Sequence, residues 1–290
     1  MPQARDNGLV LRPGTKLFRR LVTALALGGL SVFLILWGTL PFTLEVIVIA
    51  LIGLGEFYSM VERKGVRPAR TTGAVVTAMV FIGAYFLAEP FMARLLLFLL
   101  TGTLITFVLR LPERVSALLD GATTVMGFLY LGWMFSYLIL LRRIEGTVTV
   151  GPVQLPMGAA LVLLLVITVV CSDTGAYLIG KLFGRRPLSP RISPGKTQEG
   201  ALGAVLCAVS GCAWLGSLLG LPLGHLVVVG ALVAVTGQLG DLWESALKRE
   251  VGLKDSGNVL EGHGGVLDRF DSLAFAAPAF YLYLVTFILV

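Results

Sequence analysis

Charged residues and glycines concentrate in one C-terminal stretch, SALKREVGLKDSGNVLEGHGGVLDRFD, which spans residues 245–271. It combines basic residues, acidic residues, one histidine and several glycines between two apolar segments. A site that moves a phosphoryl centre between two anionic partners must hold Mg²⁺ and neutralise charge more than it must form covalent bonds. The composition of this stretch therefore indicates a phosphate site.

The carboxylates of this region are spaced so that they share helix faces. Asp268 and Asp271 are three residues apart at the start of the last apolar segment. Asp241 ends the preceding segment, and Ser245 and Lys248 follow it by four and seven residues on the same face. Mg²⁺ usually takes one or two carboxylates together with phosphate oxygens and water. We predict that Asp241 and Asp268 meet at the membrane surface and bind Mg²⁺.

Glycines surround His263 just before the last helix. Gly264 and Gly265, together with Gly262, let the backbone approach phosphate oxygens and present N–H groups near a helix N-terminus. The basic side chains available to the same phosphates are Lys248, Arg249, Lys254 and Arg269. Any one of these charges would equally suit an ordinary cytoplasmic loop, but the whole cluster favours a phosphate site.

The remaining sequence predicts that this chemistry belongs to an integral membrane protein. Of its 290 residues, 56% are hydrophobic and only 14% are charged, with a mean hydropathy of +0.88. Soluble domains are about half apolar and a quarter charged, and apolar runs of about 20 residues are long enough to cross a bilayer as helices. We predict an all-α polytopic membrane protein with spans near 21–37, 42–60, 71–87, 94–108, 122–141, 157–178, 201–219, 226–243 and 273–290.

The basic residues orient these spans, because cytoplasmic loops carry an excess of Lys and Arg. With the N-terminus inside, all 23 Lys and Arg residues fall on the cytoplasmic side except Arg94, Arg142 and Arg143. The prediction is nine spans, N-in and C-out. Residues 1–150 then form an N-terminal region of about five spans, and 151–290 a catalytic region with cytoplasmic connections at 180–200 and 245–271. No nucleic-acid ligand is expected despite the net charge of +6, since the basic residues lie in short loops.

The C-terminal motifs resemble those of the phosphatidate cytidylyltransferases, also called CDP-diacylglycerol synthases. Their signature has the form S-x-hydrophobic-K-R-x4-K-D-x-small, then H-G-G and hydrophobic-x-D-R-x-D. It is carried here by Ser245, Lys248, Arg249, Lys254, Asp255, Gly257, His263, Gly264, Gly265, Asp268, Arg269 and Asp271. Residues 171–200 and the stretch GQLGDLWESALKR are also similar to that family. The resemblance is close over about the last 120 residues, whereas the first 150 share only helicity and hydrophobicity. Glu261 stands where the family usually has Pro.

The resemblance implies a nucleotidyltransferase that joins CTP to phosphatidate, giving CDP-diacylglycerol and pyrophosphate in phospholipid biosynthesis. The predicted catalytic residues are Asp241, Asp268, Lys248, Asp271 and Asp173, with Asp241 and Asp268 as metal ligands. The predicted substrate-binding residues are Lys196, Ser245, Arg249, Lys254, His263, Gly264, Gly265 and Arg269. Mg²⁺ is the expected cofactor, and a second cation and a homodimer are left open. The expected location is the bacterial inner membrane, with the site facing the cytoplasm.

Polar residues outside the signature need separate interpretation. Asp173 follows an apolar run, where an ionisable group is costly and a functional role is the default hypothesis, with a polar contact between helices as the alternative. The motif SPGKT at 193–197 is not a P-loop, because Pro190 occupies the position of the first glycine. Glu45 and Glu56 lie in the second predicted span without a basic partner, and we expect interface or headgroup positions for them rather than catalysis.

Two other functions are compatible with parts of this pattern. A CTP-dependent polyprenol or lipid kinase, or a related lipid cytidylyltransferase, would differ in its acceptor. An ion-coupled transporter would use Glu45, Glu56, Asp173 and Asp241, but its polar groups should cluster near mid-membrane, whereas most here lie in predicted cytoplasmic loops. The cysteines offer no metal-ligand spacing and are interpreted as small buried hydrophobes: Cys171, Cys207 and Cys212.

Overall fold

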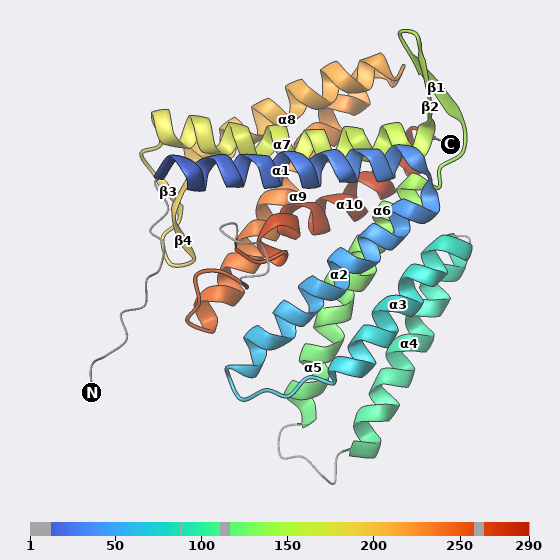
Figure 1. Cartoon of the computed structure of the whole chain (residues 1–290), viewed down its shortest axis with the longest axis vertical. Helices are drawn as coiled ribbons and strands as arrows, with labels where there is room; N and C mark the ends of the chain where they lie inside the picture. The colour runs from blue at the N-terminus through green and yellow to red at the C-terminus, as the bar shows by residue number, and fades with distance from the viewer. Residues whose placement is uncertain (1–12, 88, 111–116, 258–263, 290) are drawn as a thin grey trace.

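The structure is a computed structural model that describes residues 13–87, 89–110, 117–257 and 264–289, and these are almost entirely helical (Figure 1). The first half contains α1 (Pro13–Trp37), α2 (Thr39–Glu62), α3 (Arg70–Phe86), α4 (Glu89–Arg110), α5 (Ala117–Gly127), the π-helix η2 (Phe128–Trp133) and α6 (Met134–Arg142). The second half contains α7 (Met157–Phe183), α8 (Gln198–Leu218), α9 (Leu223–Glu250) and α10 (Leu267–Phe287). Two antiparallel hairpins flank α7: β1 (Thr147–Val150) with β2 (Val153–Pro156), and β3 (Pro187–Ser189) with β4 (Ser193–Thr197).

Within the described residues, seven helices are long and apolar enough to cross a membrane. They are α2, α4 over Phe91–Val108, the continuous Leu118–Arg142 rod of α5, η2 and α6, and α7, α8, α9 and α10. Leu25–Trp37 of α1 and Arg70–Phe86 are shorter apolar helices. Many large apolar side chains point outward, among them Phe98 (72% exposed) and Trp214 (70%). Such a surface suits hydrocarbon better than water, and the prediction of a helical membrane protein is confirmed.

The helices form two groups that meet at the α5–η2–α6 rod (Figure 1). Helices α7 to α10 pack on one another in chain order, and α2 to α5 form the second group. Helix α6 contacts both α10 and α7, and α2 also reaches α10. Large aromatic residues fill the junction: Phe57 of α2, Phe128 of η2, Phe135 of α6 and Phe280 of α10 are all at most 1% exposed. The signature helices α9 and α10 are therefore braced by the N-terminal half.

The two predicted cytoplasmic connections are shorter and more regular than expected. Helix α9 continues to Glu250, so Ser245, Lys248 and Arg249 are helical, and residues 251–266 alone separate α9 from α10. Hydropathy indicates where the apolar segment ends, but a helix whose outer turns are polar continues beyond that point. The connection at 180–200 is likewise shortened by the end of α7 and is largely the β3–β4 hairpin. Ser245, Lys248 and Arg249 are thus held on α9, and Lys196 is held on β4.

The β3–β4 hairpin is fastened to the start of α8. The Thr197 hydroxyl accepts a hydrogen bond from the Gly200 N–H at 3.1 Å, which caps α8. The carboxylate of Glu199 accepts from the N–H groups of Arg185 and Arg186 at 3.0 and 3.2 Å. These bonds fix the position of Lys196, a residue of β4 whose ammonium group reaches Asp241 of α9.

Candidate active site

Three carboxylates converge where α9 and α10 cross. Asp241 and Glu244 lie one turn apart on α9, and Asp271 lies on the first turns of α10. One oxygen from each falls within 4.8 Å of the others. Close approach of the helices makes this possible: a Cβ on Gly240 would collide with the backbone carbonyl of Asp271. The α9–α10 contact therefore builds an acidic cluster, defined here as Asp241, Glu244 and Asp271.

Glu244 is the most deeply buried member of the acidic cluster. Its side chain is 0% exposed, and Asp271 is 7% exposed as a residue, while the Asp241 side chain is 38% exposed. Among the described residues, none donates a hydrogen bond to Glu244 Oε1. A buried carboxylate oxygen without a donor is costly unless a cation or proton accompanies it. Three carboxylates with such an oxygen fit a hard divalent cation, which prefers oxygen ligands.

One lysine lies on each side of the acidic cluster. The Nζ of Lys248 lies 2.5 Å from Glu244 Oε2 and 2.7 Å from Asp268 Oδ1. The Nζ of Lys196, from the β3–β4 hairpin, lies 2.6 Å from Asp241 Oδ2. With Asp268 included, four carboxylates face these two ammonium groups. This excess of negative charge adds to the case for a cation.

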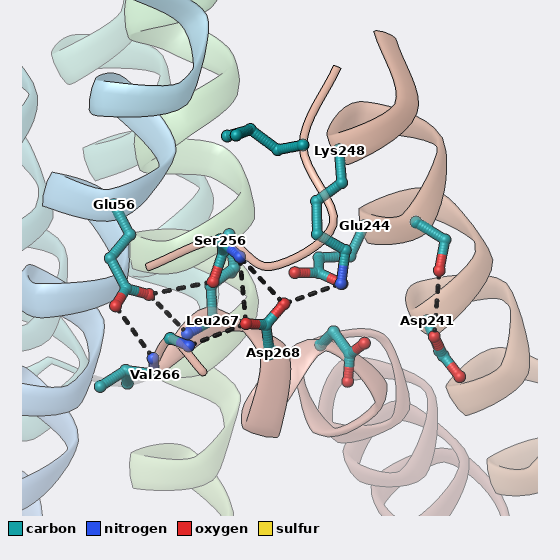
Figure 2. A network of polar contacts seen from close by, with 12 residues as sticks. Glu56, Asp241, Glu244, Lys248, Ser256, Val266, Leu267 and Asp268 are labelled. Carbon is teal, nitrogen blue, oxygen red and sulfur yellow. Dashed lines mark hydrogen bonds and ion pairs between the residues drawn. The ribbon is translucent and has the colours of Figure 1, made fainter. Parts of the chain in front are cut away.

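Asp268 is engaged differently from the acidic cluster (Figure 2). Besides Lys248, its carboxylate accepts the N–H of Ser256 at 3.0 and 3.2 Å and the N–H of Gly265 at 2.8 Å. Asp268 thus ties the described residues of the signature loop, 251–257 and 264–266, to the start of α10. Sequence spacing predicted Asp241 and Asp268 as the metal pair, and the geometry groups Asp241 with Asp271 and Glu244.

Two cavities of opposite character adjoin the acidic cluster. A polar cavity of about 410 Å³ lies between α7, the β3–β4 hairpin, α8 and α9, and its wall includes Asp173, Lys196 and Asp241. An apolar cavity of about 880 Å³ lies between α4, the α5–η2 rod, α9 and α10, and its wall includes Trp243 and Phe275. These two aromatic residues lie two and four residues from Asp241 and Asp271 on the same helices. The polar cavity therefore reaches the acidic cluster at Asp241, and the apolar cavity lies one helical turn from Asp271 at Phe275.

The other predicted substrate-binding residues are more dispersed. Ser245 Oγ lies 3.4 Å from Asp241 Oδ1, as the predicted shared helix face requires. Arg249 donates to the carbonyls of Ile192 and Leu253 and so links the β3–β4 hairpin to the segment that follows α9. Lys254 is exposed and lines a separate cleft of about 640 Å³.

The glycine-rich part of the signature is only partly described. Gly264 has a φ of 86°, a conformation that glycine tolerates, and Arg269 is exposed on α10. The N–H of Gly265, which we expected to face phosphate, donates to Asp268. His263 and Glu261 lie outside the described residues.

Sequence reasoning missed two acidic residues. Glu244 lies three residues after Asp241 and four before Lys248, a spacing that places it on the shared face of α9 and could have identified it. Glu56 of α2 gave no such signal, because its partners are backbone groups more than 200 residues away. Glu45, on the same helix, pairs with the Ser31 hydroxyl of α1.

Residues 18–287 match the Cytidylyltransferase family. The chain belongs to this family. It is 34% identical over 292 residues to the phosphatidate cytidylyltransferase of Synechocystis sp., a match that covers 92% of this chain and 96% of the relative. The phosphatidate cytidylyltransferase of Bacillus subtilis is 31% identical, with coverages of 93% and 98%, and that of Brucella suis is 35% identical, with coverages of 91% and 92%.

These matches confirm the resemblance seen in the C-terminal motifs and extend it. The family match begins at residue 18, so the first half of this cytidylyltransferase is related too, not merely helical and hydrophobic. The N-terminal helices are therefore part of the enzyme fold and not an added anchor.

Proposed function

We propose that this chain joins CTP to phosphatidate at the cytoplasmic face of a bacterial inner membrane, forming CDP-diacylglycerol and pyrophosphate. The observation that carries the proposal is the acidic cluster of Asp241, Glu244 and Asp271 between a polar and an apolar cavity. A nucleoside triphosphate suits the polar side and an acyl chain suits the apolar side. The names of the similar proteins support the same pair of substrates.

The reaction needs no protein nucleophile. An oxygen of the lipid phosphate attacks the α-phosphorus of CTP in line, and the bond from that phosphorus to the β-phosphate bridging oxygen breaks. Pyrophosphate leaves with the electron pair, and the new P–O–P linkage stays in the lipid. Lys196 lines the polar cavity, and its ammonium group, paired with Asp241 Oδ2 at 2.6 Å, would supply positive charge beside the triphosphate. Lys248, held between Glu244 and Asp268, supplies fixed positive charge on the side of the acidic cluster away from Lys196.

Divalent-cation dependence belongs to the same proposal. Asp241, Glu244 and Asp271 would hold Mg²⁺, which when bound neutralises charge on the triphosphate. The metal role predicted for Asp268 stays a prediction. Its carboxylate already accepts hydrogen bonds from Lys248, Ser256 and Gly265, which leaves fewer lone pairs for a cation. Asp173 shares the polar cavity with Lys196 and Asp241, which is consistent with its predicted catalytic role and with a second cation.

The lipid substrate explains the position of the apolar cavity. Its wall is formed by aliphatic and aromatic side chains of four helices, including Leu104, Phe107 and Val125. An acyl chain lying there keeps its hydrocarbon out of water while the phosphate reaches the acidic cluster. We propose that the acceptor phosphate enters from this side and CTP from the polar cavity.

The proposed orientation is nine spans, N-in and C-out, with α1 and α3 as the two shorter ones. It is supported by two of the three basic residues that this orientation leaves outside. Arg142 Nε donates to the Ile35 carbonyl at 2.8 Å, and Arg143 donates to the carbonyls of Ala84 and Leu87 at 2.6 and 2.7 Å. Both arginines thus bond carbonyls at helix C-termini, which accounts for their placement against the charge rule.

The division into residues 1–150 and 151–290 is kept as a proposal, with the acidic cluster wholly in the second part. A homodimer likewise stays a prediction. Incubating the purified protein with radiolabelled CTP and phosphatidate should give a labelled lipid. Replacing phosphatidate with a polyprenol should give none, and labelling of the polyprenol would favour the lipid-kinase alternative.

Orientation has its own test in intact cells. Arg186→Cys in a variant without native cysteines should react only with maleimides that enter the cell, because residue 186 lies beside the proposed site. Labelling by an impermeant maleimide would reverse the orientation and separate the site from cytoplasmic CTP.

A further inference from the structure

Glu56 of α2 contacts the signature region from the other half of the chain (Figure 2). Its carboxylate accepts the N–H of Val266 at 3.0 Å and the N–H of Leu267 at 2.9 Å, and it accepts the Ser256 hydroxyl at 3.3 Å. Glu56 is only 7% exposed. A carboxylate is buried in this way only when donors compensate its charge, and here all three donors belong to the signature loop and the start of α10.

These contacts replace a missing helix cap. The first N–H groups of a helix lack partners within it, and a polar side chain at the N-cap usually accepts one of them. The N-cap of α10 is Val266, whose side chain cannot accept a hydrogen bond. Glu56 instead supplies the acceptor from α2, and its negative charge suits the positive end of the α10 dipole.

The same carboxylate is linked to the acidic cluster through a short chain of contacts. Glu56 accepts from the Ser256 hydroxyl, and the Ser256 N–H donates to Asp268. Asp268 pairs with Lys248, which pairs with Glu244. Asp271 follows Asp268 by one turn of α10. The position of the first turn of α10 therefore determines where two carboxylates of the site stand relative to α9.

Gly265 lies directly against the Glu56 carboxylate. A Cβ placed on Gly265 would lie 2.6 Å from Glu56 Oε2 and would also collide with the Ser256 hydroxyl. Since its N–H is bonded to Asp268, this glycine is required by packing around Glu56 rather than by contact with a phosphate.

We propose that Glu56 is a positioning residue of the active site, which holds α10 and the signature loop so that Asp268 and Asp271 meet α9 correctly. The proposal rests on the proposed cytidylyltransferase function for its kinetic consequences and on the geometry alone for its effect on the cation site. It gives the N-terminal half a defined part in the reaction.

The test compares Glu56→Gln with Glu45→Gln in the full chain. Both remove a carboxylate from α2, but Glu45 pairs with Ser31 of α1, and no hydrogen bond joins it to the described residues of the signature. In the structure Val266 and Leu267 donate to different oxygens of Glu56, and glutamine replaces one of those oxygens with an NH₂ group that would face a donor. We expect Glu56→Gln to lower kcat about tenfold or more and to raise the Mg²⁺ concentration for half-maximal activity, as loss of a supporting contact does. The KM for phosphatidate should stay close to that of Glu45→Gln, whereas the Tm without Mg²⁺ should be lower, because the buried cap of α10 is weakened.

A second readout is independent of turnover. Mg²⁺ should raise the Tm of the wild type, and the midpoint of that effect should move to higher Mg²⁺ in Glu56→Gln but not in Glu45→Gln. Should Glu56→Gln not fold, Glu56→Asp keeps the charge with a shorter reach, and excess Mg²⁺ should restore part of its stability and kcat. A midpoint equal to that of Glu45→Gln, or a wild type that Mg²⁺ does not stabilise, would overturn the proposal. If the wild type labels no lipid but the midpoint is still shifted in Glu56→Gln, the proposed reaction alone is rejected.

Discussion

The two halves of the chain use their buried polar groups differently. In α7 to α10, the carboxylates and lysines around the α9–α10 crossing face one another, and Asp241 and Lys196 also line the polar cavity. In α1 to α6, several buried polar groups bond to the backbone: the Tyr58 hydroxyl donates to the Thr124 carbonyl at 3.0 Å, and Arg142 donates to the Ile35 carbonyl. Glu56 bonds to backbone as well, but to that of the other half. Reactive groups and their support thus come from different halves, so variants in each should fail in different ways.

The largest loss is expected from the acidic cluster. Asp241→Asn and Asp271→Asn keep side-chain size but remove charge that would hold Mg²⁺, so kcat should fall by about 10²-fold or more, a few kcal/mol in the barrier. The double variant should lose less than the product of the two single losses, because residues acting through one ion are not independent. Turnover at saturating CTP over a range of Mg²⁺ measures this. Near-normal activity in both folded variants would remove the cluster from the mechanism.

A smaller loss should separate Asp268 from Asp271. Asp268→Asn weakens the pairing with Lys248 but keeps an acceptor for Ser256 and Gly265. We expect kcat to fall about tenfold, with a smaller shift in Mg²⁺ dependence than in Asp271→Asn. Should the Mg²⁺ dependence of the two variants shift equally, Asp268 is a ligand, as its spacing from Asp241 predicted.

Sequence patterns located the site better than they described it. Apolar runs identified every helix, because a chain in hydrocarbon must satisfy its backbone within helices. The end of α9 was misplaced by about two turns, since its last turns are polar although still helical. Spacing placed Asp241, Ser245 and Lys248 on one face, because the helix period relates neighbours along one segment.

Contacts between segments could not be obtained in this way. Which of Asp268 and Asp271 joins Asp241 depends on the crossing of α9 with α10, and the sequence does not state that crossing. Glu56 is a stronger example, because its donors are backbone N–H groups of Val266 and Leu267, whose side chains carry no polar signal. A carboxylate in a membrane span without a basic partner in sequence is therefore also a candidate helix cap.

The smallest expected effect concerns the wall of the apolar cavity that the N-terminal half supplies. Ala122→Trp should fill part of it and raise the KM for long-chain phosphatidate roughly several-fold, with less effect on a short-chain analogue and on kcat. Leu206→Trp on the exposed face of α8 is the matched control. Equal KM values for the long-chain substrate in the two variants would place the acyl chains elsewhere.

Cytidylyl transfer itself is tested most directly by the position of the label in CTP. Purified protein, Mg²⁺ and phosphatidate should give a labelled lipid from CTP labelled at the α-phosphorus, with one pyrophosphate released per lipid, and none from CTP labelled at the γ-phosphorus. Asp271→Asn should abolish most of the α-derived label. Lipid labelled from the γ-phosphorus would show phosphoryl transfer and contradict the account.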